Sequence, residues 1–91
     1  MDNEKILTLL KIDLEISTTS RDEYLNNVID LAKASIEREG ITLEESIEDE
    51  MLVACYSAFL YRKRKSENYS MPRQLRYMLN NRLLSEKARA D

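Results

Sequence analysis

The 91-residue sequence lacks histidine and tryptophan, and it contains one glycine, one proline and one cysteine. So few helix breakers argue against a many-turned β-sandwich or barrel and favour a few helices joined by short loops. The absence of histidine excludes histidine-based acid–base catalysis, and a lone cysteine excludes Cys/His zinc sites and an internal disulfide. A single Cys55 is typical of a protein in a reducing cytosol.

The sequence also lacks a recognisable targeting or membrane-spanning segment. Residues 1–4 are acidic and do not resemble a signal peptide. The longest apolar stretch, residues 51–61, is interrupted by Ser57 and is too short for a bilayer, which needs about 20 residues. We therefore expect a soluble, intracellular protein with no membrane partner.

Charge is distributed in two blocks along the chain. Residues 1–50 contain 5 basic and 14 acidic side chains, and residues 51–91 contain 9 basic and 3 acidic ones. The net charge of −3 therefore hides an acidic half of −9 and a basic half of +6. Three explanations remain open: pairing within one molecule, contacts between copies, and nucleic-acid binding by the basic half. The overall acidity argues against the third, because autonomous DNA-binding domains usually carry net positive charge.

The periodicity of apolar residues predicts an all-α domain with four helices and no internal repeat or domain boundary. Hydrophobic residues make up 43% and charged residues 34% of the chain, which is typical of a folded, soluble protein. The second and third helices should lie antiparallel. The four helices are expected at residues 3–11, 21–39, 47–65 and 72–87, and an extended exit is expected at residues 13–16.

Local signals mark the ends of these helices. Ser20 and Glu23 have the spacing of a capping box, in which each side chain satisfies a free backbone N–H group. Gly40 can adopt the left-handed conformation that ends a helix. Ser46 and Asp49 give a weaker cap signal before the third helix.

The third helix is apolar on almost every side at residues 51–61, so it must be covered on every side. Three other helices are few for this task, and a partner chain could supply part of the cover. We expect Tyr56 or Phe59 to fill the core and Cys55 to behave as a small buried hydrophobe. The five tyrosines of the chain are expected mostly in the core or at its edge, although tyrosine is also a favoured interface anchor.

The fourth helix carries two apolar stripes, and Pro72 fits its first turn. One stripe can pack on the domain's own core, while the second needs another surface. Residues 86–91 are expected to fray. The first stripe consists of Leu75, Met78, Leu79 and Leu83, and the second of Tyr77, Leu84 and Ala88.

A basic cluster ends the third helix. Positive charge favours the C-terminal end of a helix and keeps it soluble, which is the simpler interpretation. The alternative is a contact with an acidic partner or a nucleic-acid backbone. The cluster consists of Arg62, Lys63, Arg64 and Lys65.

The residues required for catalysis or cofactor binding are not apparent. The only glycine is a helix stop, so no glycine-rich loop cradles a phosphate. The acidic run at residues 44–50 lacks the alternation and the glycine of a calcium loop, and we expect it to be solvated. We therefore expect no enzyme activity, no cofactor and no metal.

The order of the motifs resembles the small head–tail connector proteins of tailed bacteriophages, also called neck adaptor or DNA-packaging proteins. A first helix ends in LKID (residues 10–13), and YLNNVIDLAKASIE (residues 24–37) is similar to the second helix of the family. An Ala- and Tyr-bearing helix follows at residues 53–61 and ends in basic residues. The segment MPRQLRYMLNNR (residues 71–82) completes the pattern, which covers nearly the whole chain.

The resemblance implies a structural subunit that forms a homo-oligomeric ring beneath the portal, extends the DNA channel and joins head to tail. Implied partners are other copies, the portal protein and the next neck or tail-completion protein, with DNA only as non-specific cargo. The implied location is the virion neck, and the host cytoplasm during assembly. Residues 71–91 correspond to the docking element of the family. We expect the interface to contain Tyr77, Leu84, Arg73, Arg76, Arg82 and Arg89.

The alternative is a small helical regulator that binds DNA or a partner through the basic C-terminal half. A helix-turn-helix needs two helices joined by a tight turn, often with glycine. In this sequence the only glycine follows an acidic helix, and the loop before the fourth helix is long. The connector is therefore the favoured hypothesis.

Overall fold

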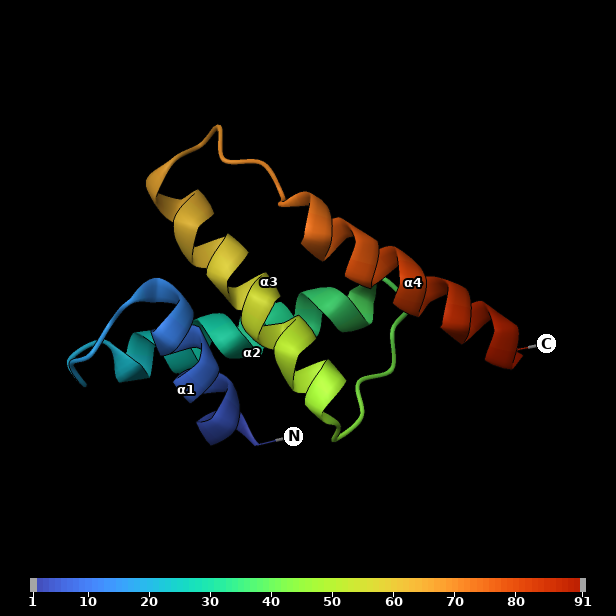
Figure 1. The fold of residues 1–91 in the computed structure, drawn as a ribbon, viewed down its shortest axis with the longest axis horizontal. Coiled ribbons are helices and arrows are strands. Elements are labelled where there is room, and N and C mark those ends of the chain that lie inside the picture. The colour runs from blue at the N-terminus through green and yellow to red at the C-terminus, as the bar shows by residue number, and fades with distance from the viewer. Residues whose placement is uncertain (1, 91) are drawn as a thin grey trace.

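The computed structural model describes residues 2–90, apart from the Ala90 side chain, and these residues form four α-helices without any strand. The helices are α1 (Asn3–Leu14), α2 (Asp22–Arg38), α3 (Ile47–Lys65) and α4 (Arg73–Ala90). The molecule measures 45 × 30 × 18 Å, and α4 lies along its outer side (Figure 1). The prediction of a small all-α domain with four helices is confirmed.

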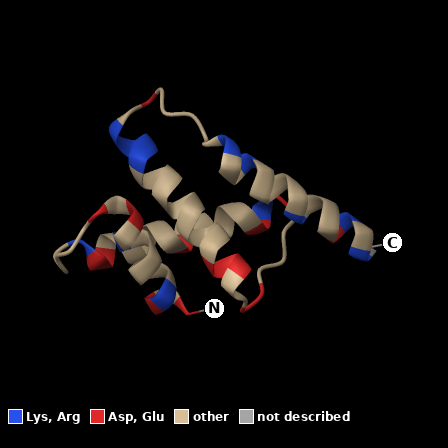
Figure 2. Cartoon of the chain, in the orientation of Figure 1, with Lys and Arg blue, Asp and Glu red and all other residues tan. Residues whose placement is uncertain are grey.

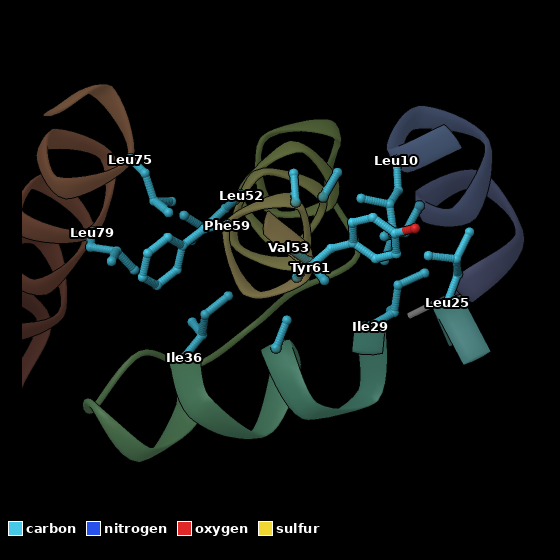
Figure 3. Packing of buried hydrophobic residues seen from close by; sticks show 14 of the residues in the cluster. Leu10, Leu25, Ile29, Ile36, Leu52, Val53, Phe59, Tyr61, Leu75 and Leu79 are labelled. Atoms are coloured by element: carbon cyan, nitrogen blue, oxygen red, sulfur yellow. The ribbon is translucent and has the colours of Figure 1, made fainter. Parts of the chain in front are cut away.

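Helix α3 forms the centre of the domain, with α1 and α4 on opposite sides and α2 crossing it on a third side (Figure 3). The second and third helices therefore cross and do not lie antiparallel as predicted. This arrangement covers most of the apolar surface of α3 within a single chain. Phe59 is buried as predicted, while Tyr56 is half-buried and packs edge-on against the Phe59 ring, with the centroids 5.9 Å apart. Cys55 is half-buried rather than fully buried. The main contacts of α3 are with Leu10 of α1, Leu25, Ile29 and Ile36 of α2, and Leu75 and Leu79 of α4.

Helix α1 is longer than predicted, and the expected extended exit is wrong. The helix continues to Leu14, because this side chain packs against the core one turn beyond Leu10. Glu15 then ends the helix in the left-handed conformation, with φ of 58°. The backbone N–H of Ile16 donates to the Lys11 carbonyl at 2.9 Å, which closes the last turn in a Schellman-type arrangement without glycine.

The two ends of α2 differ in how well the sequence predicted them. The capping box is wrong: Arg21 occupies the cap position and makes no side-chain cap hydrogen bond, while the Ser20 hydroxyl lies 3.2 Å from that of Thr18. The Gly40 stop is confirmed, with φ of +106° directly after the helix. The Arg21 side chain instead makes a tertiary contact, in which its guanidinium donates to the hydroxyl of Tyr61 on α3.

Helix α3 begins and ends where the sequence predicts. The Ser46 hydroxyl oxygen accepts a hydrogen bond from the Asp49 backbone N–H at 3.1 Å, so the cap signal is confirmed. Helix α4 starts just after Pro72, whose carbonyl accepts from the Arg76 N–H at 3.1 Å. It continues as a helix to Ala90, through most of the segment that was expected to fray, and Asp91 lies outside the described residues. The Glu86 carboxylate, which accepts from the Thr42 backbone N–H at 3.1 Å, helps to hold this end against the chain.

Candidate interaction surface on helix α4

Helix α4 presents one apolar stripe to the core and the other to solvent. Leu75 and Leu79 are buried against α3, whereas Tyr77 is 58% exposed and Leu84 is 66% exposed. Ala88 is also exposed. The predicted division of α4 into two faces therefore agrees with the burial of its side chains within one chain.

The exposed stripe is surrounded by positive charge. Arg73, Tyr77, Leu84 and Lys87 follow one another at spacings of four, seven and three residues, which places them on one exposed face of the helix. Arg76 is exposed beside this face. We call this surface, comprising Arg73, Arg76, Tyr77, Leu84 and Lys87, the α4 ridge.

Arg82 lies away from the ridge and is engaged within the chain. Its guanidinium forms an ion pair with Asp49 and donates to the Thr42 carbonyl at 2.5 Å. It also lies 3.4 Å from the carboxylate of Glu86, the only acidic residue of α4. The hydrogen bond to Asp49 raises the pKa of Arg82, although desolvation by burial opposes this effect. Arg82 is 18% exposed and holds α4 against α3. The sequence analysis instead expected it in an interface with another molecule.

Asp49 is the residue of this region that sequence reasoning missed. The acidic run was expected to be solvated, but Asp49 is 1% exposed, so this expectation is wrong for it. Its carboxylate accepts from Arg82 and from the Glu44 backbone N–H at 2.5 Å. The Ser46–Asp49 cap signal places Asp49 in the first turn of α3, but it carries no information about a partner on α4.

Arg89 also contacts the acidic half of the chain. Its guanidinium lies 3.2 Å from the Glu44 carboxylate and 3.9 Å from that of Glu86. Because its side chain is 58% exposed, this pair is screened by solvent and remains accessible.

Each member of the basic cluster has a contact within the chain. The Arg62 guanidinium pairs with the Asp13 carboxylate at 3.1 Å and donates to its backbone carbonyl at 3.2 Å. The other three lie over aromatic rings: Lys63 over Phe59, Arg64 over Tyr24 and Lys65 over Tyr61, at 5.6, 4.7 and 5.2 Å from the ring centroids. These contacts agree with the simpler interpretation, in which the cluster completes the end of α3, and they leave Lys63, Arg64 and Lys65 exposed.

A groove of about 420 Å³ lies between the start of α3 and the middle of α4. Its wall is largely apolar, and Ile47 at its edge is 78% exposed. The sequence did not predict that Ile47 would be exposed. Met51, which is also exposed, belongs to the apolar run for which a partner chain could supply part of the cover. We call this hollow the α3–α4 groove; it is lined mainly by Ile47, Met51, Leu52, Met78, Asn81 and Ser85.

Charge is segregated on the surface of the domain. Lys and Arg gather at the end of α3 and along α4, whereas Asp and Glu gather at the start of α3 and near the N-terminus (Figure 2). The ion pairs of Arg62, Arg82 and Arg89 each join the basic half of the chain to the acidic half. Pairing within one molecule therefore accounts for part of the charge asymmetry, and the α4 ridge keeps its positive charge.

Other chemistry is limited in the described part of the chain. Residues 2–90 contain no group of three or more metal-ligating side chains suited to a metal ion. None of the helices within this range has the length and hydropathy needed to cross a membrane. Burial raises the pKa of the Cys55 thiol, with a further contribution from the negative charge of Asp13, so the thiol is less reactive than an exposed one.

Comparisons with models of protein families, with curated proteins and with solved structures found no match to the chain. What the fold defines is a compact all-α domain of four helices. The resemblance to phage head–tail connectors rests on the order of the four sequence motifs.

Proposed function

We propose that this protein is a non-catalytic structural subunit of a phage head–tail connector. In this role, copies form a ring beneath the portal, extend the DNA channel and contact the next neck or tail-completion protein. DNA passes through the ring as non-specific cargo. Helix α4 is the docking element in this proposal, with Tyr77 and Leu84 as its apolar anchors.

The observation that supports this proposal most directly is the exposure of Tyr77 and Leu84 on a helix whose opposite face already packs on α3. Fully burying a large apolar side chain contributes about 1.5–3 kcal/mol. Two such side chains in an otherwise polar helix are therefore suitable anchors for a protein contact. Tyrosine and arginine are also enriched among the residues that dominate binding energy at interfaces.

The charge distribution supports a contact between unlike surfaces. A positive ridge on α4 and negative charge near the start of α3 favour head-to-side association, the heterologous geometry that closes rings. Charge then steers and orients the subunits, while the apolar anchors provide most of the affinity. Assembly should weaken moderately as salt is raised.

The test is the double variant Tyr77→Ala/Leu84→Ala. Because both side chains lie outside the core, we expect its circular dichroism and melting temperature to match the wild type. Its incorporation into portal-containing particles should fall at least tenfold, as expected when about 1.4 kcal/mol or more of binding free energy is lost.

The matched control removes two exposed apolar side chains elsewhere, in Ile12→Ala/Leu31→Ala. We expect this control to be incorporated like the wild type. Normal incorporation of the α4 variant with a normal helical spectrum would remove the ridge from the interface. Loss of the helical spectrum would assign Tyr77 and Leu84 to the core instead.

The second candidate function is a regulator that binds DNA through the basic edge formed by α4 and the end of α3 (Figure 2). The observation in its favour concerns the α3 part of this edge: a hollow of about 310 Å³ between the end of α3 and the start of α2 is lined by Arg21, Arg64 and Lys65, together with Ser20 and Tyr24. We expect a duplex titration at moderate salt to show weak binding without sequence preference. Nanomolar, sequence-selective binding would favour the regulator over the connector.

A further inference from the structure

The α3–α4 groove has the features of a receptor for an apolar helix face. Its most exposed wall is formed by Ile47 and Met51, on the first turns of α3. The groove continues along α4 past Met78 and Ser85, so it follows the helix for about two turns. An apolar groove of this length accommodates side chains spaced seven residues apart on one helix face.

The groove is acidic where α3 begins. Its lining includes Glu48, together with Asp49 and Arg82, whose opposite charges neutralise each other. On the other side of Ile47, a second hollow of about 260 Å³ is lined by Asp2, Glu45 and Glu50 together with Lys5. Ile47 therefore projects between two hollows whose rims are predominantly acidic.

The α4 ridge has complementary properties. It presents Tyr77 and Leu84, seven residues apart, with Arg73, Arg76 and Lys87 beside them and no carboxylate of α4 on that face. The single acidic residue of α4, Glu86, is paired with Arg82 on the other side of the helix. The ridge thus fits the groove in spacing and in apolar character, and its charge is opposite in sign to that around Ile47.

We propose that the occupant of the α3–α4 groove is the α4 ridge of a second copy of this chain. This inference rests on the proposed ring assembly and identifies the surface of the neighbour that receives Tyr77 and Leu84. The positive residues of the ridge meet the acidic rim around Ile47. Charge complementarity orients this contact. Two grooves facing each other, or two ridges, would bring like charges together and repel.

Each chain carries both surfaces at different positions, so the contact is heterologous. Met78 and Ser85 of the groove follow Tyr77 and Leu84 by one residue, which rotates them by about 100° around α4. The ridge therefore cannot enter its own groove, and both surfaces remain open in one molecule. A chain that binds one neighbour by its ridge keeps its groove for another, which is the requirement for a ring or an open filament.

A mixing experiment tests this inference directly. The ridge variant is Tyr77→Ala/Leu84→Ala, and the groove variant is Ile47→Ala/Met51→Ala. All four side chains are exposed, so we expect wild-type helical spectra for both variants. In sedimentation analysis, wild-type protein should form assemblies larger than a dimer as its concentration rises, and each variant alone should remain monomeric. An equimolar mixture should form a dimer and nothing larger, because the intact ridge of one variant binds the intact groove of the other.

Each other result contradicts the inference in an identifiable way. If the groove variant assembled on its own, the groove would not be the receptor. A ridge that binds the ridge of another copy would produce such assembly, because this variant keeps its ridge intact. A monomeric mixture would exclude ridge-to-groove pairing. Wild-type protein that stays monomeric at millimolar concentration would overturn the proposed contact between copies.

Charge reversal provides a second, independent measurement. Arg73→Glu on the ridge should weaken association at low salt by about tenfold or more, and the loss should shrink as salt is raised. Arg64→Glu is the matched control, because it makes the same change in charge at the end of α3, outside both surfaces. Equal effects of the two variants would show that net charge, rather than the ridge, controls association.

Particle incorporation separates this inference from the proposed function. If the groove variant enters portal-containing particles normally while the ridge variant does not, the ridge binds the portal and the contact between copies is wrong. If neither variant is impaired in particles although the mixture forms dimers, the pairing between copies stands and the proposed function fails.

Discussion

The ion pair between Asp49 and Arg82 is expected to be the main polar contact that fixes α4 on α3. Removing one member of a buried pair costs about 3–5 kcal/mol, because the other charge is left without a partner. Asp49 is 1% exposed but Arg82 is 18% exposed, so water can partly solvate the charge that is left without a partner. For Arg82→Met we therefore expect a loss of stability at the lower end of this range, about 3 kcal/mol. Methionine retains much of the apolar stem. In a domain of this size, that loss lowers the melting temperature by about 12–24 °C.

The control for this prediction lies on the same helix. Arg89→Met also removes an ion-paired arginine, but its side chain is 58% exposed. Exposed pairs contribute about 0–1 kcal/mol, so the expected change is less than about 8 °C. Thermal melts followed by circular dichroism measure both variants.

A double-mutant cycle isolates the pair from the packing of the arginine stem. Asp49→Asn keeps an acceptor for the Glu44 backbone N–H and removes the charge, at an expected cost of about 2 kcal/mol. Combining it with Arg82→Met should cost less than the sum of the single changes by about 0.5–3 kcal/mol. Additive losses, or an Arg82→Met variant no less stable than Arg89→Met, would refute the reasoning. The attachment of α4 would then depend on its apolar contacts and on its other polar contacts, such as that of Glu86 with the Thr42 backbone N–H.

Three further predictions concern the core, the stop after α2 and the thiol. Phe59→Ala should cost about 3–5 kcal/mol, because the ring is buried, and should leave the domain largely unfolded in a thermal melt; a near-wild-type transition would contradict this. Gly40→Ala should cost about 1–2 kcal/mol in denaturant titration through its backbone conformation, since an added Cβ meets only Leu83, at 3.8 Å; an unchanged midpoint would show that the turn relaxes. Burial raises the pKa of Cys55, so between pH 7 and 8.5 native protein should react with iodoacetamide more slowly than unfolded protein, and equal rates would contradict this.

Much of the fold could be predicted from signals that act over a few residues. The bounds of α3 follow from the Ser46 cap and from the end of its apolar run, and Gly40 marks the end of α2 because few other residues adopt its conformation. The exposure of Tyr77 and Leu84 follows from helical spacing, since one helix cannot turn both of its stripes to the same core. The sequence therefore predicts the apolar part of the ridge. The prediction does not single out Lys87, and it includes Arg82, which the structure places in an ion pair with Asp49.

Local signals failed where a tertiary contact was stronger. Ser20 and Glu23 have capping-box spacing, but the structure places Arg21 at the cap, with its guanidinium on Tyr61, which is 40 residues away. Helix α1 extends past its predicted end because Leu14 gains cover from the core. In both cases the end of a helix coincides with a tertiary contact, and such contacts leave no periodic pattern in the sequence.

The sequence by itself determined the helical class, the central place of an all-round apolar helix and the two faces of α4. The tertiary structure alone decided which charges are paired and where a groove opens. Asp49 and Arg82 are 33 residues apart, and their pairing depends on the path of the loop that brings α4 back along α3. The groove exists because that path leaves Ile47 and Met51 uncovered beside α4. Spacing along a chain specifies which side chains share a helix face, whereas the packing of helices determines what that face meets.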